Sequence, residues 1–298
     1  MKTVPVDALY NNPADCLIDV RLAEDFDHQH LPRAKSNCVF EVAFAGRLAE
    51  QAPYKENPVV IYGANAKSQE APMAAEKMER LGYQNVVVVD GGIEAWKAAG
   101  HPVEGEGESN EPFPPAFADG QYSLDLEESR IEWTGRNLLN KHWGTIGLKS
   151  GSLKIAGEKL TGGEIVIDMT DMHCSDLEGE MHDGLIAHLQ SDDFFDTEKY
   201  PEAFFRILSS QKIPNATPGN QNLIVRAELE MKGVTAPVEL GACAGIAPDG
   251  SLAAQSSFLI DRTVWNVIYG SGKFFHRLGM HLVNDLVDIE LKVVARLT

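Results

Sequence analysis

The segment best suited to carry chemistry is residues 59–70, Val-Val-Ile-Tyr-Gly-Ala-Asn-Ala-Lys-Ser-Gln-Glu. Its first four residues predict a buried strand, and Ala74, Ala75 and Met78 follow at helical spacing. A strand, a tight loop and a helix bring backbone N–H groups and a helix N-terminus together around a bound anion or a reacting atom. The loop, residues 63–68, carries no cysteine, histidine or acidic side chain that could react there.

Cysteines are the other candidate nucleophiles. None of the four is spaced as a CxxC pair, and thiols in a reducing compartment are the default expectation for such a chain. The four are Cys16, Cys38, Cys174 and Cys243.

Histidines concentrate in the second half of the chain, where they could bind a metal. Six of the nine lie there, namely His142, His173, His182, His188, His276 and His281. They do not follow an HxxxH pattern, and the gap between His182 and His188 places these two on different faces of a helix. We therefore predict no metal site. A metal-dependent activity at the barrel mouth stays an open alternative, because Cys174 adjoins His173 and the acidic residues Asp171 and Asp176 flank this pair.

The first hundred residues alternate between predicted strands and predicted helices. Strands are expected at residues 17–21, 37–39, 59–62 and 86–90, and helical segments at 24–26, 41–50, 70–81 and 93–99. Alternation of this kind predicts an α/β domain with a parallel sheet covered on both faces.

Motifs on these elements resemble the rhodanese family. They read Asp-Val-Arg from Asp19, His-Leu-Pro from His30, and Asp-Gly-Gly-Ile-Glu-Ala-Trp from Asp90. The resemblance covers roughly residues 5–105, and implies a cysteine nucleophile in the loop after the central strand that takes up sulfane sulfur as a persulfide. The matching position is Gly63, and the basic residue five positions later in that family is matched by Ser68.

Residues 1–105 are therefore expected to form a catalytically silent rhodanese-like domain. The vacated loop consists of Gly63, Ala64, Asn65, Ala66, Lys67 and Ser68. Its amides and Lys67 could still bind an anion, or the domain could serve only for structure or docking. The alternative is a sulfurtransferase that uses Cys38 or Cys16, although apolar neighbours of Cys38 are more typical of a buried, unreactive thiol.

Residues 106–119 are predicted to be a linker, because they combine glycine, acidic residues and a cluster of prolines. After them the apolar period changes to two, most clearly at residues 225–232 and 287–293. Many half-buried strands predict an all-β antiparallel barrel or sandwich over residues 120–298, with one helix at 177–190.

The second half resembles the YceI-like family. The motifs are Ser-Asp-Asp-Phe-Phe-Asp from Ser191, Tyr200-Pro201, and Met-Lys-Gly-Val-Thr from Met231. The resemblance implies a lipocalin-like barrel whose apolar interior holds a long polyisoprenoid chain. Leu185 and Ile186 replace a charged pair of that family, which puts any headgroup contact made by the pair in doubt.

Aromatic residues and one histidine are the candidate ligand contacts in this barrel. They are Trp133, Trp143, His188, Phe194, Phe195, Phe204, Phe205, Phe258, Trp265, Tyr269, Phe274 and Phe275, with Ile260 as an aliphatic candidate. The same residues would also suit a side-chain-filled core, so both interpretations stay open. A bound isoprenoid or quinone-like lipid is expected, and no other cofactor is required.

Composition excludes several classes of partner. A net charge of −18 argues against nucleic-acid binding, which needs a basic surface. No signal peptide or membrane-spanning run is found, so we expect a cytoplasmic protein without stable membrane insertion. Composition is compatible with a homodimer as well as with a monomer. The predicted fold is a parallel α/β rhodanese-like domain followed by an antiparallel lipocalin-like barrel.

Overall fold

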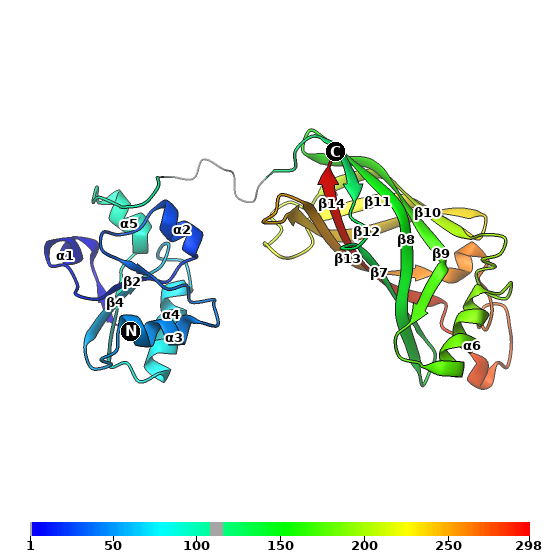
Figure 1. The fold of residues 1–298 in the computed structure, drawn as a ribbon, viewed down its shortest axis with the longest axis horizontal. Helices are drawn as coiled ribbons and strands as arrows, with labels where there is room; N and C mark the ends of the chain where they lie inside the picture. The colour runs from blue at the N-terminus through cyan, green and yellow to red at the C-terminus, as the bar shows by residue number, and fades with distance from the viewer. Residues whose placement is uncertain (1, 108–115) are drawn as a thin grey trace. The chain divides into compact units, whose positions relative to one another are not determined.

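The chain forms two compact units, Met1–Glu111 and Pro112–Thr298, in a computed structural model that describes residues 2–107 and 116–298 (Figure 1). Most of the predicted linker, 106–119, lies outside the described residues. Within the described residues, no helix is both long enough and apolar enough to cross a membrane.

The first unit contains one five-stranded sheet in the order β1-β5-β4-β2-β3, with every pair parallel. Its strands are β1 (Lys2–Val4), β2 (Leu17–Asp19), β3 (Lys35–Ser36), β4 (Pro58–Tyr62) and β5 (Asn85–Val89). Its helices are α1 (Val6–Asn11), α2 (Ala23–His28), α3 (Phe44–Gln51), α4 (Glu70–Arg80) and α5 (Gly92–Ala98). The predicted parallel α/β architecture is confirmed.

Two apolar cores cover the two faces of this sheet. On one face α3 and α4 bury Phe44, Leu48 and Met78 against β2, β4 and β5. On the other, α1 and α5 bury Leu9 and Trp96. Packing on both faces explains why the central strands read as continuous apolar runs.

The strand predicted at residues 37–39 lies earlier in the chain, as β3 (Lys35–Ser36). Residues beyond β3 remain attached to the end of β2, since Val39 N donates to Val20 O at 3.1 Å. Asn37 is fully buried and donates through Nδ2 to Phe44 O at 3.2 Å. This side-chain bond ties the segment to α3, so the chain leaves regular strand geometry there.

A buried ion pair follows β2. Arg21 Nη2 lies 2.6 Å from Asp19 Oδ2, and the two side chains are 8% and 1% exposed. The same guanidinium donates to Gln29 O at 2.6 Å, which fixes the end of α2. Burial, and then the nearby Asp19 carboxylate, raise the pKa of the adjacent Tyr62, which therefore stays neutral and accepts from Leu31 N at 3.0 Å.

The second unit is a closed antiparallel barrel. Its strands are β6 (Gly120–Leu124), β7 (Arg130–Arg136), β8 (Lys141–Ala156), β9 (Lys159–Cys174), β10 (Glu202–Lys212), β11 (Leu223–Met231), β12 (Val234–Ile246), β13 (Leu252–Asp261) and β14 (Leu286–Leu297). Neighbours from β8 to β13 pair in sequence order, and β14 closes the ring on β13.

The strands β6 and β7 together fill one position in the ring. Both lie between β8 and β14, with β6 paired to one end of these long strands and β7 to the other. The barrel therefore has eight strand positions, the number typical of lipocalins, and the predicted antiparallel barrel is confirmed.

One α-helix interrupts the strands of the barrel. It is α6 (Gly179–Gln190), two residues shorter than predicted, and lies at the end of the barrel away from the C-terminus (Figure 1). Two short 3-10 turns, η1 (Arg262–Trp265) and η2 (Gly279–His281), lie in the connection between β13 and β14.

The buried ion pair predicts a large effect of a single substitution. We expect Asp19→Ala to lower the free energy of unfolding of the first unit by about 3–5 kcal/mol, because the Arg21 guanidinium would remain buried without its carboxylate. Denaturant-dependent hydrogen exchange on the full chain, followed on peptides from β2 and β4, measures the change in this unit alone.

The control is Glu76→Ala, which removes an exposed pair with Arg80 at 3.7 Å on α4. It should cost about 0.5 kcal/mol or less, because exposed helix pairs contribute little. Equal effects of the two substitutions would show that the buried pair does not hold the unit together.

Candidate functional site

The barrel encloses a cavity of about 270 Å³. Strand alternation creates it, since every second residue of a strand points to the same face. On β14 the inward residues are Val287, Ile289, Leu291 and Val293, whereas Asp288 and Glu290 between them do not line the cavity. Lys292 borders it as well. An apolar interior with few polar groups is the usual character of a small-molecule site.

The remaining walls come from β6 to β13, α6 and nearby loops. Aliphatic and methionine side chains form much of these walls, with Ala203 as the smallest: Ile131, Ile146, Leu148, Ile165, Ile167, Met169, Met172, Leu185, Leu189, Ala203, Leu229, Met231, Val238 and Ile260. At the β7–β8 turn the lining becomes polar. We call Arg136, Asn137, Asn140 and His142 the mouth.

His188 lies within the largely apolar lining of the cavity. It projects from α6, and its ring meets Phe194 and Tyr269 edge to face, with centroids 5.1 and 4.5 Å apart. Its Nε2 is buried and has no hydrogen-bond partner within the described parts of the chain. Because an unmatched buried nitrogen costs free energy, a polar group of a ligand would be favoured beside it.

Arg262 lines the cavity as well and was missed by sequence reasoning. It is 2% exposed, and its donors go to backbone carbonyls, among them Asn284 O at 3.0 Å and Val283 O at 3.2 Å. Desolvation lowers the pKa of this guanidinium. The Cζ atom of Arg262 lies 5.5 Å from the centroid of the Phe194 ring, so the guanidinium helps to hold this ring in place. It also contributes positive charge to the cavity wall.

The structure brings seven of the twelve predicted contacts into the cavity lining. They are Trp133, His188, Phe194, Phe195, Phe205, Phe258 and Tyr269. Contact of these residues with a ligand stays a prediction. Such contact requires that they line one cavity, as they do.

Phe204 and Trp265 do not line the cavity, and our placement of them there is corrected. Phe204 follows the inward Ala203 and precedes the inward Phe205, so alternation turns it outward, where the Arg206 guanidinium lies 5.1 Å from its ring. Trp265 is buried in the core instead, with its indole Nε1 donating to Leu229 O at 2.8 Å.

Trp143, Phe274 and Phe275 also lie outside the cavity lining, which is a further correction. All three are exposed, Trp143 at 41% with Lys141 over its ring. Phe274 and Phe275 belong to the irregular connection before η2, where no strand period directs a side chain inward.

The vacated rhodanese-like loop is closed by its own side chains. Asn65 Oδ1 accepts from Lys67 N at 2.9 Å and from Ser68 N at 3.1 Å. Ser68 Oγ in turn accepts from Asn65 N at 3.2 Å. An anion bound in the loop would need these same amides as hydrogen-bond donors. Because they are already bonded, the loop has fewer donors to offer an anion.

A carboxylate faces this loop. A Cβ built on Gly63 would lie 3.4 Å from Glu70 Oε2 and 3.3 Å from Ser68 Oγ. Glu70 Oε2 is buried and has no hydrogen-bond partner within the described residues. Its charge opposes both a bound anion and a thiolate at the position of Gly63.

The two cysteines considered as substitute nucleophiles lie in protected places. Cys38 is 2% exposed. Cys16 packs beside the α3–α4 core, and burial raises the pKa of its thiol. A reactive cysteine needs an accessible thiolate, so neither position favours persulfide chemistry.

The histidine-rich region brings some of its members together. His182 Nε2 lies 3.2 Å from His173 Nδ1, and Asp183 lies 3.0 Å from the other ring nitrogen of His182. His188, on the same helix, points into the cavity instead. The different directions of His182 and His188 agree with their spacing.

Comparison with protein families finds two matches. The description "YceI-like domain" matches residues 122–295, and "Rhodanese-like domain" matches residues 5–99. Comparison with curated proteins gave no match.

Solved structures resemble each unit separately. BcnA of Burkholderia cenocepacia is 21% identical, with 58% of this chain and 99% of that chain covered and a TM-score of 0.46. A polyisoprenoid binding domain from Saccharophagus degradans is 17% identical, with 59% and 98% covered and a TM-score of 0.44. The rhodanese-like domain of the Anabaena sp. Alr3790 protein is 27% identical, with 40% and 88% covered and a TM-score of 0.33.

The loop geometry predicts the outcome of restoring the thiol. We expect Gly63→Cys to give at most weak transfer of sulfur from thiosulfate to cyanide, because the Glu70 carboxylate disfavours the thiolate and no cation stands at Ser68. The double variant Gly63→Cys with Glu70→Gln should be about tenfold faster near neutral pH, as one unit of thiol pKa implies.

Gly63→Ser is the matched control, since it adds a similar side chain without a thiol. Robust turnover by Gly63→Cys alone would show that the loop retains working geometry and that neither Glu70 nor Ser68 matters as argued.

Proposed function

The chain belongs to the YceI-like domain family, and we propose that its barrel binds and carries a long apolar molecule such as an isoprenoid or quinone-like lipid. The observation behind the proposal is the barrel cavity of about 270 Å³, whose surface is almost wholly apolar. Water finds few hydrogen-bond partners in such a cavity. An apolar chain that enters it is stabilised, because its own surface is removed from water.

The polar groups in the wall support a ligand with one hydrogen-bonding end. His188 Nε2 lacks a partner within the described residues, and Tyr269 and Phe194 hold its ring. A hydroxyl or carbonyl oxygen at this nitrogen would satisfy it. We therefore favour an isoprenoid alcohol, phenol or quinone over a plain hydrocarbon.

For the rhodanese-like unit we propose docking rather than catalysis. The amides of Asn65, Lys67 and Ser68 are satisfied by side chains of the loop itself, and Glu70 adds a negative charge beside them. These contacts weaken the case for anion binding. No comparable observation favours a sulfurtransferase through Cys16 or Cys38.

Filling the cavity should abolish carriage. Ala203 is buried in the lining on β10, so Ala203→Phe would place a ring where the ligand lies. We expect at least a tenfold loss of affinity for geranylgeraniol, measured by equilibrium binding on the full chain, with organic extracts of the purified protein analysed by mass spectrometry.

Ala253→Phe is the control, because Ala253 lies on β13 outside the cavity lining and in step with outward neighbours. It should leave affinity unchanged. An absence of geranylgeraniol binding together with extracts free of apolar molecules would refute the proposed function.

A second substitution tests the polar end of the ligand. His188→Phe keeps a ring against Phe194 and Tyr269 but removes the nitrogen. One hydrogen bond is worth about 1 kcal/mol, so geranylgeraniol should bind about fivefold more weakly. The matching hydrocarbon phytane should bind equally well to both proteins. Equal losses for the two probes would mean that His188 only shapes the wall.

A further inference from the structure

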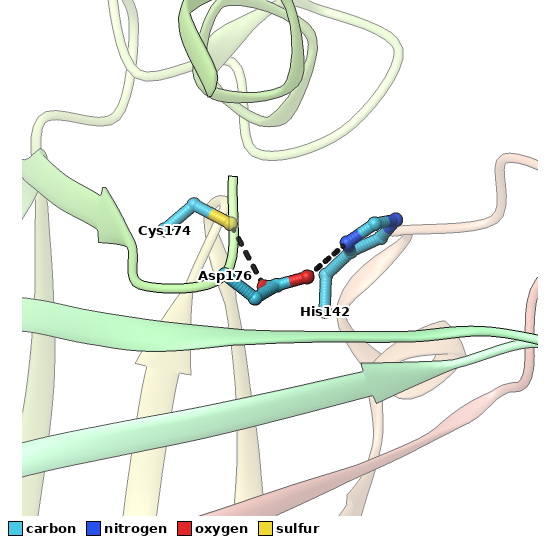
Figure 2. Close-up of side chains that lie close together, drawn as sticks. All are labelled: His142, Cys174 and Asp176. Carbon is cyan, nitrogen blue, oxygen red and sulfur yellow. Dashed lines mark hydrogen bonds and ion pairs between the residues drawn. The ribbon is translucent and has the colours of Figure 1, made fainter. Parts of the chain in front are cut away.

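Three potential metal ligands meet beside the mouth of the barrel. They are His142 at the start of β8, Cys174 at the end of β9, and Asp176 two residues later (Figure 2). Asp176 lies between the other two, with Oδ2 2.9 Å from His142 Nδ1 and Oδ1 3.2 Å from Cys174 Sγ. One ligand atom from each residue lies within 4.8 Å of the others.

The ligand atoms are close enough to converge on one small cation after a small movement. Ligand atoms bound to a tetrahedral zinc lie about 3.3–3.8 Å apart, as follows from bonds of about 2.0–2.3 Å. One atom from each residue lies within 4.8 Å of the others, so side-chain rotations have to close a gap of up to about 1 Å. Imidazole, thiolate and carboxylate are all common zinc ligands.

The backbone holds this arrangement in place. Gly144 pairs with Cys174 across the two strands, and a Cβ on Gly144 would lie 1.7 Å from His173 O. Glycine is therefore required for β8 and β9 to approach so closely. Trp143 N donates to Asp176 Oδ1 at 3.0 Å and orients the carboxylate. Support of a ligand by an outer hydrogen bond is typical of metal sites.

We propose that His142, Cys174 and Asp176 form a binding site for a divalent transition-metal cation, with Zn²⁺ as the best match to the donor set. On binding, the Cys174 thiol loses its proton to solvent and the sulfur becomes a metal ligand. The His142 proton moves from Nδ1 to Nε2, which frees Nδ1 to bind the cation. Water completes the coordination, because three protein ligands leave a position open.

The three residues lie at the edge of the cavity lining. Their side chains range from fully buried Cys174 to His142, whose side chain is 40% exposed. His142 also lines the cavity as part of the mouth, so a bound cation would lie next to these polar lining residues. The proposal stands on the three residues and does not depend on the identity of the cavity ligand.

Titration of the full chain with Zn²⁺, after treatment with chelator and reductant, tests the proposal by calorimetry in buffers of different ionisation enthalpy. We expect one saturable site with release of about one proton. His142→Gln, Cys174→Ser and Asp176→Asn should each weaken binding at least tenfold. His142→Gln is the decisive variant, since its exposed side chain can be changed with the least risk to folding.

Co²⁺ provides a readout of the sulfur ligand. We expect a thiolate-to-cobalt absorption band in the near ultraviolet, lost in Cys174→Ser and kept in the control Cys243→Ser. A cobalt spectrum without this band would overturn the proposal.

His182→Gln controls for the neighbouring imidazole pair and should change zinc affinity by less than twofold. If His182→Gln removes binding while His142→Gln does not, the cation belongs to the His173–His182 pair and the proposed site is wrong. Absence of saturable zinc binding in the unmodified chain would overturn it as well.

Discussion

Closure of the barrel by β14 is the constraint on which the second unit depends. This strand pairs with β13 along its length and with β7 and β6 on its other side, so the sheet closes on itself. Once eight positions are closed, the diameter is set by strand number and stagger. The inward side chains can then fill the interior or leave space. With Ala203 and aliphatic residues on the walls, space remains.

The first unit shows how a fold can keep its architecture while its loop changes character. The sheet still places residues 63–68 between β4 and α4, where amides converge. The side chains of Asn65 and Ser68 accept hydrogen bonds from three of the six loop amides, and each bond forms within the loop. An external anion would have to displace both side chains and approach Glu70. The loop is therefore stable without a ligand, which fits a domain retained for its surface or its fold.

The spacing of apolar residues and the family motifs predicted both folds, because both signals can be recognised in short stretches of sequence. Alternation on β14 identified its inward residues correctly. The neighbours Phe204 and Phe205 mark the limit of such reasoning, since a strand can turn only one of two adjacent residues inward and tertiary pairing decides which. Phe274 and Phe275 lie in an irregular segment that has no period. Arg262 was invisible because the carbonyls that satisfy it come from the connection to β14, about twenty residues away.

Sequence spacing could not predict that His142, Cys174 and Asp176 lie together, because their proximity depends on the register of β8 and β9. From the turn onward the two strands pair almost regularly until Gly147 opposes Asp168. The next residue, Ile146, opposes Met172, so the partner advances by four positions where a regular ladder advances by one. A regular hairpin would have placed His142 opposite His173. The bulge instead aligns Gly144 with Cys174 and carries Asp176 to His142. Bulges often redirect side chains near functional sites, and their position depends on packing that spacing alone does not reveal.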